Sequence, residues 1–89
     1  MRDIYTDRND NGGNNMWHEG SLEVGKSIFR YCIKAYGEGS EYGIGEGRIS
    51  KLMLKRKGKV VCNYDRGWDI RPRDQDTLQA LEELKKSYN

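Results

Sequence analysis

Residues 28–36 read IFRYCIKAY, and this stretch decides the fold class. Its apolar side chains Phe29, Tyr31 and Ile33 alternate with the charged side chains Arg30 and Lys34. Because successive side chains of a β-strand point to opposite faces of a sheet, the alternation predicts a half-buried antiparallel strand. The neighbouring parts of the chain are therefore expected to supply its partner strands.

Three further segments have the composition and alternation of strands. They are residues 16–24 (MWHEGSLEV), 48–56 (RISKLMLKR) and 59–65 (KVVCNYD). The second and third are joined by a Lys57-Gly58 turn, which predicts a hairpin. The expected inward-facing residues are Leu22 and Val24 in the first segment, Ser50, Leu52 and Leu54 in the second, and Val60, Cys62 and Tyr64 in the third; Ile49 falls on the mixed face.

The period changes near the C-terminus, where apolar residues recur every three or four positions at Leu78, Leu81, Leu84 and Tyr88. This spacing predicts an amphipathic α-helix, capped by Asp74 or Asp76. A four-stranded sheet alone would leave an apolar face in water, and the helix has the apolar stripe that can cover it. The prediction is an α+β fold: a four-stranded antiparallel meander with one C-terminal α-helix packed on one face.

Residues 1–15 contain little apolar bulk beyond Ile4 and Tyr5. Such a segment cannot bury enough surface to offset its ordering entropy, so we expect a disordered N-terminal tail. Residues 16–89 then form a single ββββα domain. A body of this size has little room for both a core and a deep cleft, which favours a small binding module over an enzyme.

The net charge is +2, from 16 Lys and Arg against 14 Asp and Glu, but its distribution is uneven. The glycine-rich loop, residues 37–47, holds five of the eleven glycines and three glutamates. The basic hairpin, residues 48–59, follows it and contains no acid. Its six cations are Arg48, Lys51, Lys55, Arg56, Lys57 and Lys59.

Two functions are open for the glycine-rich loop. Its backbone could approach a ligand closely, or it could be a mobile connection between strands. It does not match the dinucleotide pattern G-x-G-x-x-G, because Tyr42 interrupts it. Glu41 would repel an anion unless Arg48 neutralised it, so a polar or cationic partner group is equally admissible.

Residues 20–27 read GSLEVGKS and match the phosphate-loop pattern G-x-x-x-x-G-K-S. That motif works only between a strand and a helix. Here Leu22 and Val24 lie inside it in strand phase and a strand pattern follows it, so we predict no nucleotide hydrolysis.

Metal, redox and membrane functions have little support in the sequence. His18 is the only histidine and has no cysteine cluster beside it, so neither a metal nor a cofactor is expected. Cys32 and Cys62 are expected to be reduced and buried, with a cross-strand disulfide as the alternative. No signal peptide or membrane span is visible, which predicts a cytoplasmic protein.

Residues 63–72 read NYDRGWDIRP and concentrate aromatic and charged groups. They could hold the connection to the helix, or they could form a binding surface, since aromatics and arginine dominate binding hot spots. Together with the loop and hairpin they supply the candidate binding residues: Glu41, Tyr42, Arg48, Lys51, Asp65, Arg66, Trp68 and Asp69.

The motifs SEYGI (residues 40–44), GRISKL (47–52) and YDRG (64–67), after an opening Met16-Trp17, resemble a family of short uncharacterised proteins from bacteria, phages and mobile elements. The resemblance covers residue 16 to the C-terminus and implies a compact domain that closes on a helix. It implies no established activity, but accessory proteins of this size often bind and regulate a host component.

Two functional hypotheses follow. The first is a non-enzymatic module that binds and inhibits or regulates a host or defence protein. The alternative is binding of nucleic acid, or of a nucleotide-like anion, through the basic hairpin and the glycine-rich loop. Lysines at strand edges also prevent aggregation, so the hairpin charges have a purely structural explanation as well. The oligomeric state is open.

Overall fold

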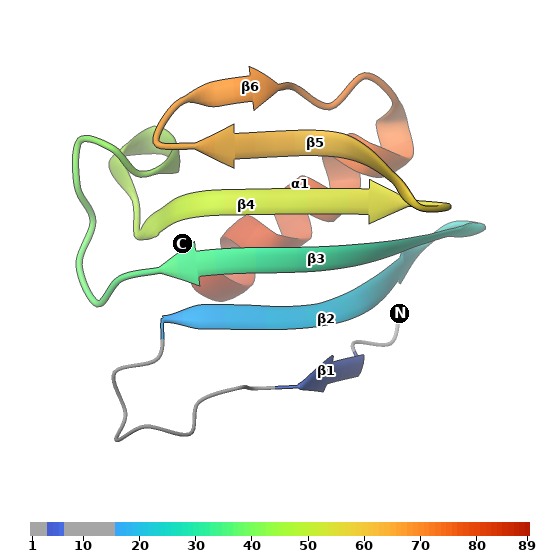
Figure 1. Cartoon of the computed structure of the whole chain (residues 1–89), viewed down its shortest axis with the longest axis horizontal. Coiled ribbons are helices and arrows are strands. Elements are labelled where there is room, and N and C mark those ends of the chain that lie inside the picture. Colours follow the sequence, from blue (N-terminus) through green and yellow to red (C-terminus); the bar gives the residue numbers. More distant parts are fainter. Residues whose placement is uncertain (1–3, 7–15) are drawn as a thin grey trace.

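A computed structural model describes residues 4–6 and 16–89 of the chain. Those residues form two layers, an antiparallel sheet and a helix that crosses one of its faces (Figure 1). The strands lie in the sheet in chain order, which confirms the α+β class, the meander and the C-terminal helix. The elements are β1 (Ile4–Thr6), β2 (Trp17–Val24), β3 (Ser27–Ala35), the 3-10 helix η1 (Ile44–Glu46), β4 (Ile49–Arg56), β5 (Lys59–Asp65), β6 (Trp68–Ile70) and α1 (Gln75–Tyr88).

The predicted number of strands was wrong. Between Trp17 and Ile70 the sheet has five strands, not four, because the chain turns back after β5 and pairs again as β6. With three residues, β6 is too short to display an alternation in the sequence. The short β1 pairs with β2 at the opposite edge. The predicted disordered tail otherwise lies outside the described residues.

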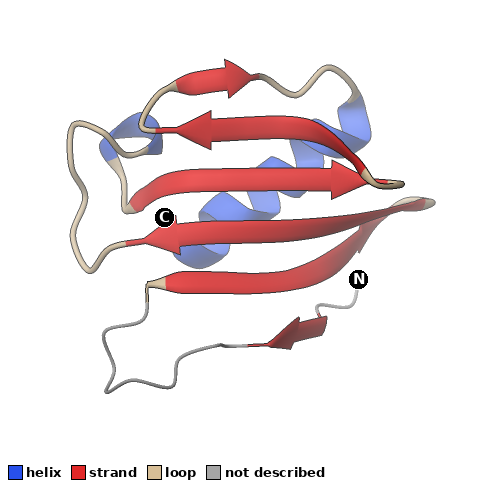
Figure 2. Ribbon diagram, viewed as in Figure 1, coloured by secondary structure: helices blue, strands red, loops and turns tan. Residues whose placement is uncertain are grey.

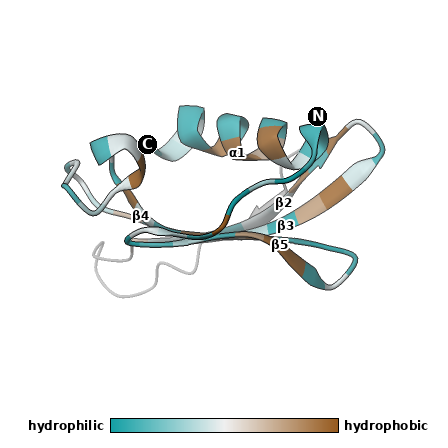
Figure 3. Ribbon diagram, turned by 90° about the horizontal axis from the view of Figure 1, so that it is seen from above, coloured by the Kyte–Doolittle hydropathy of each residue, from teal (hydrophilic) through white to brown (hydrophobic). Residues whose placement is uncertain are grey.

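The core lies between α1 and the sheet (Figures 2 and 3). Phe29, Tyr31 and Ile33 all point into it, as their alternation predicted, and each is at most 3% exposed. The helix contributes Ala80, Leu81 and Leu84. Leu78, which the periodicity placed on the buried stripe, is instead 41% exposed, because the buried face of α1 is centred on Thr77, Ala80, Leu81 and Leu84.

Two β-bulges change which residues face the core. The register shifts between Lys34 and Ala35, so that Ala35 pairs with Ile49 and Ser50 is the extra residue. Ile49 is consequently fully buried, contrary to its predicted place on the mixed face. A second shift, between Leu54 and Lys55, leaves Val60 39% exposed, although it was predicted to point inward.

The start of α1 is bonded to two strands. Asp74, one of the two predicted caps, is the N-cap of the helix. Its carboxylate accepts a hydrogen bond from the Thr77 amide at 2.8 Å. The same carboxylate accepts two bonds from the Arg56 guanidinium of β4, at 2.7 and 3.2 Å. Ser27 of β3 donates to Asp76 at 2.9 Å. These contacts fix the helix across the central strands.

The loops gather at the two ends of the strands (Figure 1). The glycine-rich loop and the β5–β6 turn lie at one end, and the β2–β3 and β4–β5 turns lie at the other. Residues 20–27, which match the phosphate-loop pattern, run through β2 and its turn into β3. No helix follows them, so this stretch lacks the geometry that a phosphate loop needs.

Candidate functional site

The face of the sheet that α1 does not cover, the open face, carries four cations on its two central strands. Arg30 and Lys34 come from β3, in the opposite phase to the core residues, and Lys51 and Lys55 come from β4. The register places Arg30 directly opposite Lys55 and Lys34 directly opposite Lys51. These four residues are called the basic stripe.

Like charges directly opposite each other destabilise an antiparallel pair. Among the described residues, no carboxylate lies within ion-pair distance of Arg30 or Lys55. Lys51 has one distant partner, with its Nζ 3.8 Å from Asp65 Oδ1. The two pairs lie four residues apart along the strands, or about 13 Å. The stripe is therefore a line of incompletely neutralised positive charge.

Acidic residues border the stripe on both sides. The alternation of β2 places Glu19 and Glu23 on the open face beside β3. On the other side lie Asp65 at the end of β5 and Asp69 of β6, which accepts a hydrogen bond from Asn63 at 3.0 Å. The positive potential is thus confined to a strip that runs along β3 and β4, and an anionic ligand would be aligned with the strands.

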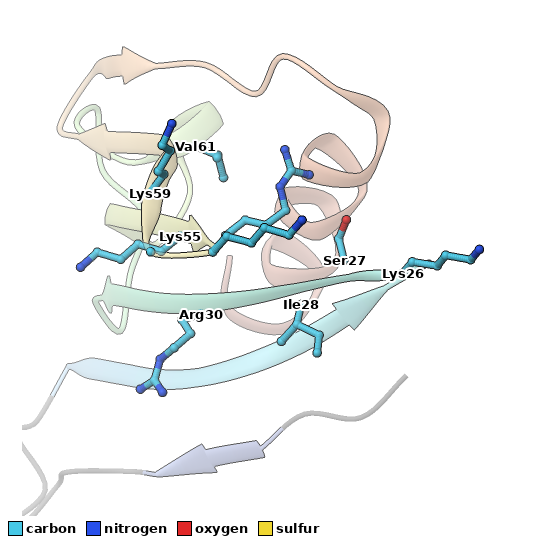
Figure 4. Close-up of a pocket in the computed structure, with 10 residues that line it drawn as sticks. Lys26, Ser27, Ile28, Arg30, Lys55, Lys59 and Val61 are labelled. Carbon is cyan, nitrogen blue, oxygen red and sulfur yellow. The ribbon is translucent and has the colours of Figure 1, made fainter.

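At one end the stripe opens into a groove of about 1030 Å³ between the tips of the β2–β3 and β4–β5 hairpins (Figure 4). This hairpin groove contains no carboxylate among its lining residues. Arg30 and Lys55 belong to both the stripe and the groove. The lining residues are Lys26, Ser27, Ile28, Arg30, Lys55, Arg56, Lys57, Gly58, Lys59 and Val61.

Arg56 differs from the other hairpin cations. Its guanidinium makes two hydrogen bonds to Asp74, and it lies 5.3 Å from the centre of the Phe29 ring. The hydrogen bonds raise the pKa of Arg56, and the pKa of Asp74 is held well below its usual range by Arg56 and by the Thr77 amide. Arg56 therefore helps to hold the start of α1 against β4, a structural role that Lys55, Lys57 and Lys59 do not have.

At the other end, the stripe meets a second pocket of about 520 Å³, the loop pocket. The glycine-rich loop and the β5–β6 turn lie around this end of β3 and β4 (Figure 1). Three cations line the pocket together with two tyrosines, two serines and one glutamate. The lining residues are Lys34, Tyr36, Glu38, Ser40, Tyr42, Ser50, Lys51 and Arg66.

The Lys34 ammonium group lies near two aromatic rings at one wall of the loop pocket. It lies 5.3 Å from the centre of the Tyr36 ring and 5.6 Å from that of Trp17. A hydrogen bond from Lys34 lowers the pKa of the Tyr36 phenol, and Ser50 and Lys51 contribute in the same direction. Lys34 is therefore held among aromatic rings at the end of the stripe.

Arg66 enters the loop pocket from a constrained turn. Its φ is 57°, in the left-handed region that arginine seldom adopts. The turn is held by two backbone hydrogen bonds, from the Arg66 amide to the Ser50 carbonyl at 2.8 Å and from the Asp65 amide to the Gly67 carbonyl at 2.9 Å. Thus β4 fixes the backbone that carries this side chain.

The structure brings together four of the eight predicted binding residues. Tyr42, Lys51 and Arg66 line the loop pocket, and Asp65 lies within 3.9 Å of both Lys51 and Arg66. Because Asp65 approaches two of the pocket's cations, it partly neutralises them.

The other four predicted residues lie elsewhere. Trp68 packs edge-on against Tyr64, with ring centres 5.1 Å apart, and the Arg71 guanidinium lies 5.2 Å from the centre of the Trp68 ring. Asp69 bonds to Asn63, and Arg48 donates to the Asn89 carbonyl at 3.4 Å. Glu41 is exposed in the loop and does not line the pocket.

Sequence reasoning missed Arg30, Lys34, Tyr36 and Trp17 as parts of this surface. The phase of Arg30 and Lys34 was visible in the sequence, and it marked them as the solvent side of a strand. Their significance comes from the residues opposite them, which depend on the register between β3 and β4.

The two cysteines lie on opposite faces of the sheet. Cys62 is buried, and burial raises the pKa of its thiol to about 11, so it is protonated at neutral pH. Cys32 is only half-buried, contrary to its predicted interior position, because it shares the phase of Arg30 and Lys34. No disulfide joins them.

Residues 4–6 and 16–89 contain no helix that has both the length and the apolar character of a membrane span. They also contain no group of three or more His, Cys, Asp or Glu side chains that could hold a metal ion.

Fold and site together define a small α+β domain, with an antiparallel meander backed by one helix and a basic stripe on the opposite face. The chain belongs to the family described as Domain of unknown function (DUF7678), whose model matches residues 16–89. The comparisons with curated proteins and with solved structures returned no significant match.

Proposed function

We propose that this protein binds single-stranded nucleic acid along the basic stripe. The observation that carries the proposal is the placement of Arg30 opposite Lys55 and of Lys34 opposite Lys51. This arrangement weakens the sheet unless an anion neutralises it. A sugar-phosphate backbone supplies negative charges at regular intervals along a line, which is the form of charge that the stripe complements.

Aromatic side chains at the end of the stripe favour a single strand over a duplex. Trp17, Tyr36 and Tyr42 are 36%, 39% and 54% exposed. Unpaired bases stack on such rings, and this stacking requires no particular base sequence. The acidic borders of the stripe also favour a narrow ligand, since a duplex would bring phosphates against Glu19 and Glu23.

Fluorescence anisotropy with labelled oligonucleotides tests this function directly. Single-stranded DNA and RNA are compared with a duplex of the same sequence, between about 50 and 200 mM salt. If all four stripe cations contact phosphates, the plot of log affinity against log salt has a slope of about −3 for single strands. Duplex binding that is tighter than single-strand binding would contradict the proposal, as would no binding at the lowest salt.

A pair of variants separates the stripe from total charge. Lys55→Ala removes a stripe cation, whereas Lys86→Ala removes an exposed cation from the last turn of α1 in the other layer. We expect Lys55→Ala to reduce the salt slope by about 0.7, the contribution of one contact, and Lys86→Ala to leave it unchanged. Equal losses for both variants would indicate nonspecific attraction and overturn the stripe as the binding site.

A host or defence protein is the second candidate partner, in keeping with a phage or mobile-element accessory role. The exposed aromatics support it, because tyrosine and tryptophan also anchor protein interfaces. A pull-down with and without nuclease distinguishes the candidates. A nuclease-resistant partner that Tyr42→Ala releases, and that Lys55→Ala retains, would favour the protein partner. Neither candidate assigns a catalytic role to any residue.

A further inference from the structure

The loop pocket has a chemistry that the rest of the stripe lacks. Along β3 and β4 the stripe presents two cations at a time, but in the pocket Lys34 and Lys51 are joined by Arg66. Glu38 is the single carboxylate among the lining residues. The pocket therefore combines three cations from three different segments with hydroxyl groups that can donate hydrogen bonds.

The position of the pocket also matters. The glycine-rich loop contributes Ser40 and Tyr42 to its walls, between the end of β3 and the start of β4. The hairpin groove at the other end of the stripe has the larger volume, about 1030 Å³ against about 520 Å³. A strand that lies along the stripe would therefore reach the glycine-rich loop at this end of the sheet.

Arg66 is the residue of the loop pocket that best suits a phosphate ligand. Its left-handed backbone is unfavourable for arginine, and asparagine or glycine would fit the turn with less strain. The side chain offers five N–H donors in a planar fork, which suits the oxygens of a phosphate group. Its only ion pair in the described residues is with Asp65, at 3.9 Å.

We infer that the loop pocket binds the phosphate monoester at one end of a nucleic acid strand, an inference that rests on the proposed function. A terminal phosphate carries a charge of about −1.5 to −2, compared with −1 for each internal phosphate. Lys34, Lys51 and Arg66 match that higher charge. Tyr36 and Tyr42 line the same pocket and can stack on the terminal base.

The test uses three oligonucleotides of one sequence, with a 5′-phosphate, with a 3′-phosphate, and with hydroxyl groups at both ends. One phosphorylated form is expected to bind about tenfold more tightly than the form with two hydroxyl ends, the effect of one added charge-assisted contact. Adenosine 5′-monophosphate serves as a separate probe. If it binds as tightly as the phosphorylated oligonucleotide, the ligand is a free mononucleotide and the strand-end inference is overturned.

Arg66→Asn assigns the effect to the pocket. Asparagine tolerates the left-handed turn, so the melting temperature should not fall. We expect this variant to lose the preference for the phosphorylated end while it binds the hydroxyl-ended oligonucleotide within about twofold of the native protein. Arg73→Asn, at an exposed arginine outside the pocket, should keep the preference.

The possible outcomes distinguish a failure of the terminal-phosphate inference from a failure of the proposed single-strand binding. If all three oligonucleotides bind equally, the proposed function stands and the terminal-phosphate inference is wrong. The inference is also wrong if the preference survives in Arg66→Asn. If none of the three binds, both the function and the inference fail.

Discussion

Arg30 of β3 and Lys55 of β4 are register partners on the open face, and neither has a carboxylate at ion-pair distance within the described part of the chain. The pair lines the hairpin groove at one end of the basic stripe. Its repulsion lowers the stability of the isolated protein and is relieved when an anion binds. Two positive charges at these positions therefore lower the stability of the fold but favour the binding of an anion.

Lys55→Glu tests whether fold stability and oligonucleotide affinity change in opposite directions. The change places a carboxylate opposite Arg30, and we expect it to stabilise the fold by about 0.2–1 kcal/mol while it abolishes oligonucleotide binding. Urea unfolding gives the stability, and fluorescence anisotropy gives the affinity. Lys55→Ala should fall between the native protein and Lys55→Glu in both measurements. A clear loss of stability in Lys55→Glu would show that the two side chains do not repel each other.

The lowered pKa of Asp74 predicts that the stability of the fold decreases at acidic pH. Arg56 and the Thr77 amide lower its pKa in the folded state, so its contribution to stability is complete above the unfolded value of about 3.9 and is lost as the pH falls through the lower folded value. Asp74→Ala should therefore cost about 1 kcal/mol at pH 7, the usual effect of losing an N-cap. The difference from the native protein should narrow below about pH 4. Thermal unfolding across this pH range measures it, and a constant difference would exclude this linkage.

Gly43 is predicted to be essential to the glycine-rich loop. A Cβ at this position would collide with the carbonyl oxygen of Gly47 and would lie 2.8 Å from its carbonyl carbon. Because these are backbone atoms, the loop must shift, and Gly43→Ala should cost about 1–3 kcal/mol. Gly37→Ala is the control, since a Cβ there meets nothing within 4 Å. Denaturant unfolding of the two variants should separate them, and equal stabilities would refute the close approach.

Asn89 holds the same loop to the sheet. Its side-chain oxygen accepts a hydrogen bond from the Ile49 amide at 2.9 Å, and its side-chain nitrogen donates to the Ile44 carbonyl at 3.0 Å. Asn89→Ala leaves both backbone groups unpaired, which should cost about 1–3 kcal/mol. Ser87→Ala, at an exposed position on α1, should change stability by less than about 0.5 kcal/mol. Hydrogen exchange at the Ile49 amide provides a local readout: exchange as slow in Asn89→Ala as in the native protein would rule out this contact.

The fold was largely predictable because most of its signals are local. The alternation in residues 28–36 correctly placed Phe29, Tyr31 and Ile33 in the core, and Asp74 was one of the two predicted helix caps. The β6 strand was missed because three residues cannot display a period. Ile49 and Val60 were misplaced because a β-bulge shifts the phase of a strand without a mark in its hydrophobic pattern.

The candidate site was less predictable. Tyr42, Lys51, Asp65 and Arg66 were identified as unusual residues, and they do lie near one another at one end of the sheet. Arg56 was grouped with the free hairpin cations, although it is bound to Asp74, 18 positions further along the chain. Trp68 was assigned to the binding surface, but it packs against Tyr64 beside the core.

By itself, the sequence determined that Phe29, Tyr31 and Ile33 face the core and that a C-terminal helix begins near Asp74, because these depend on a period of two or of 3.6 residues and on a cap. Only the tertiary structure decided that Arg30 faces Lys55, that Lys34 faces Lys51, and that Arg66 joins them at the loop pocket. Those relationships depend on the register between strands. Register is set by the packing of the whole core against α1 and by bulges, to which residues distant in the chain contribute.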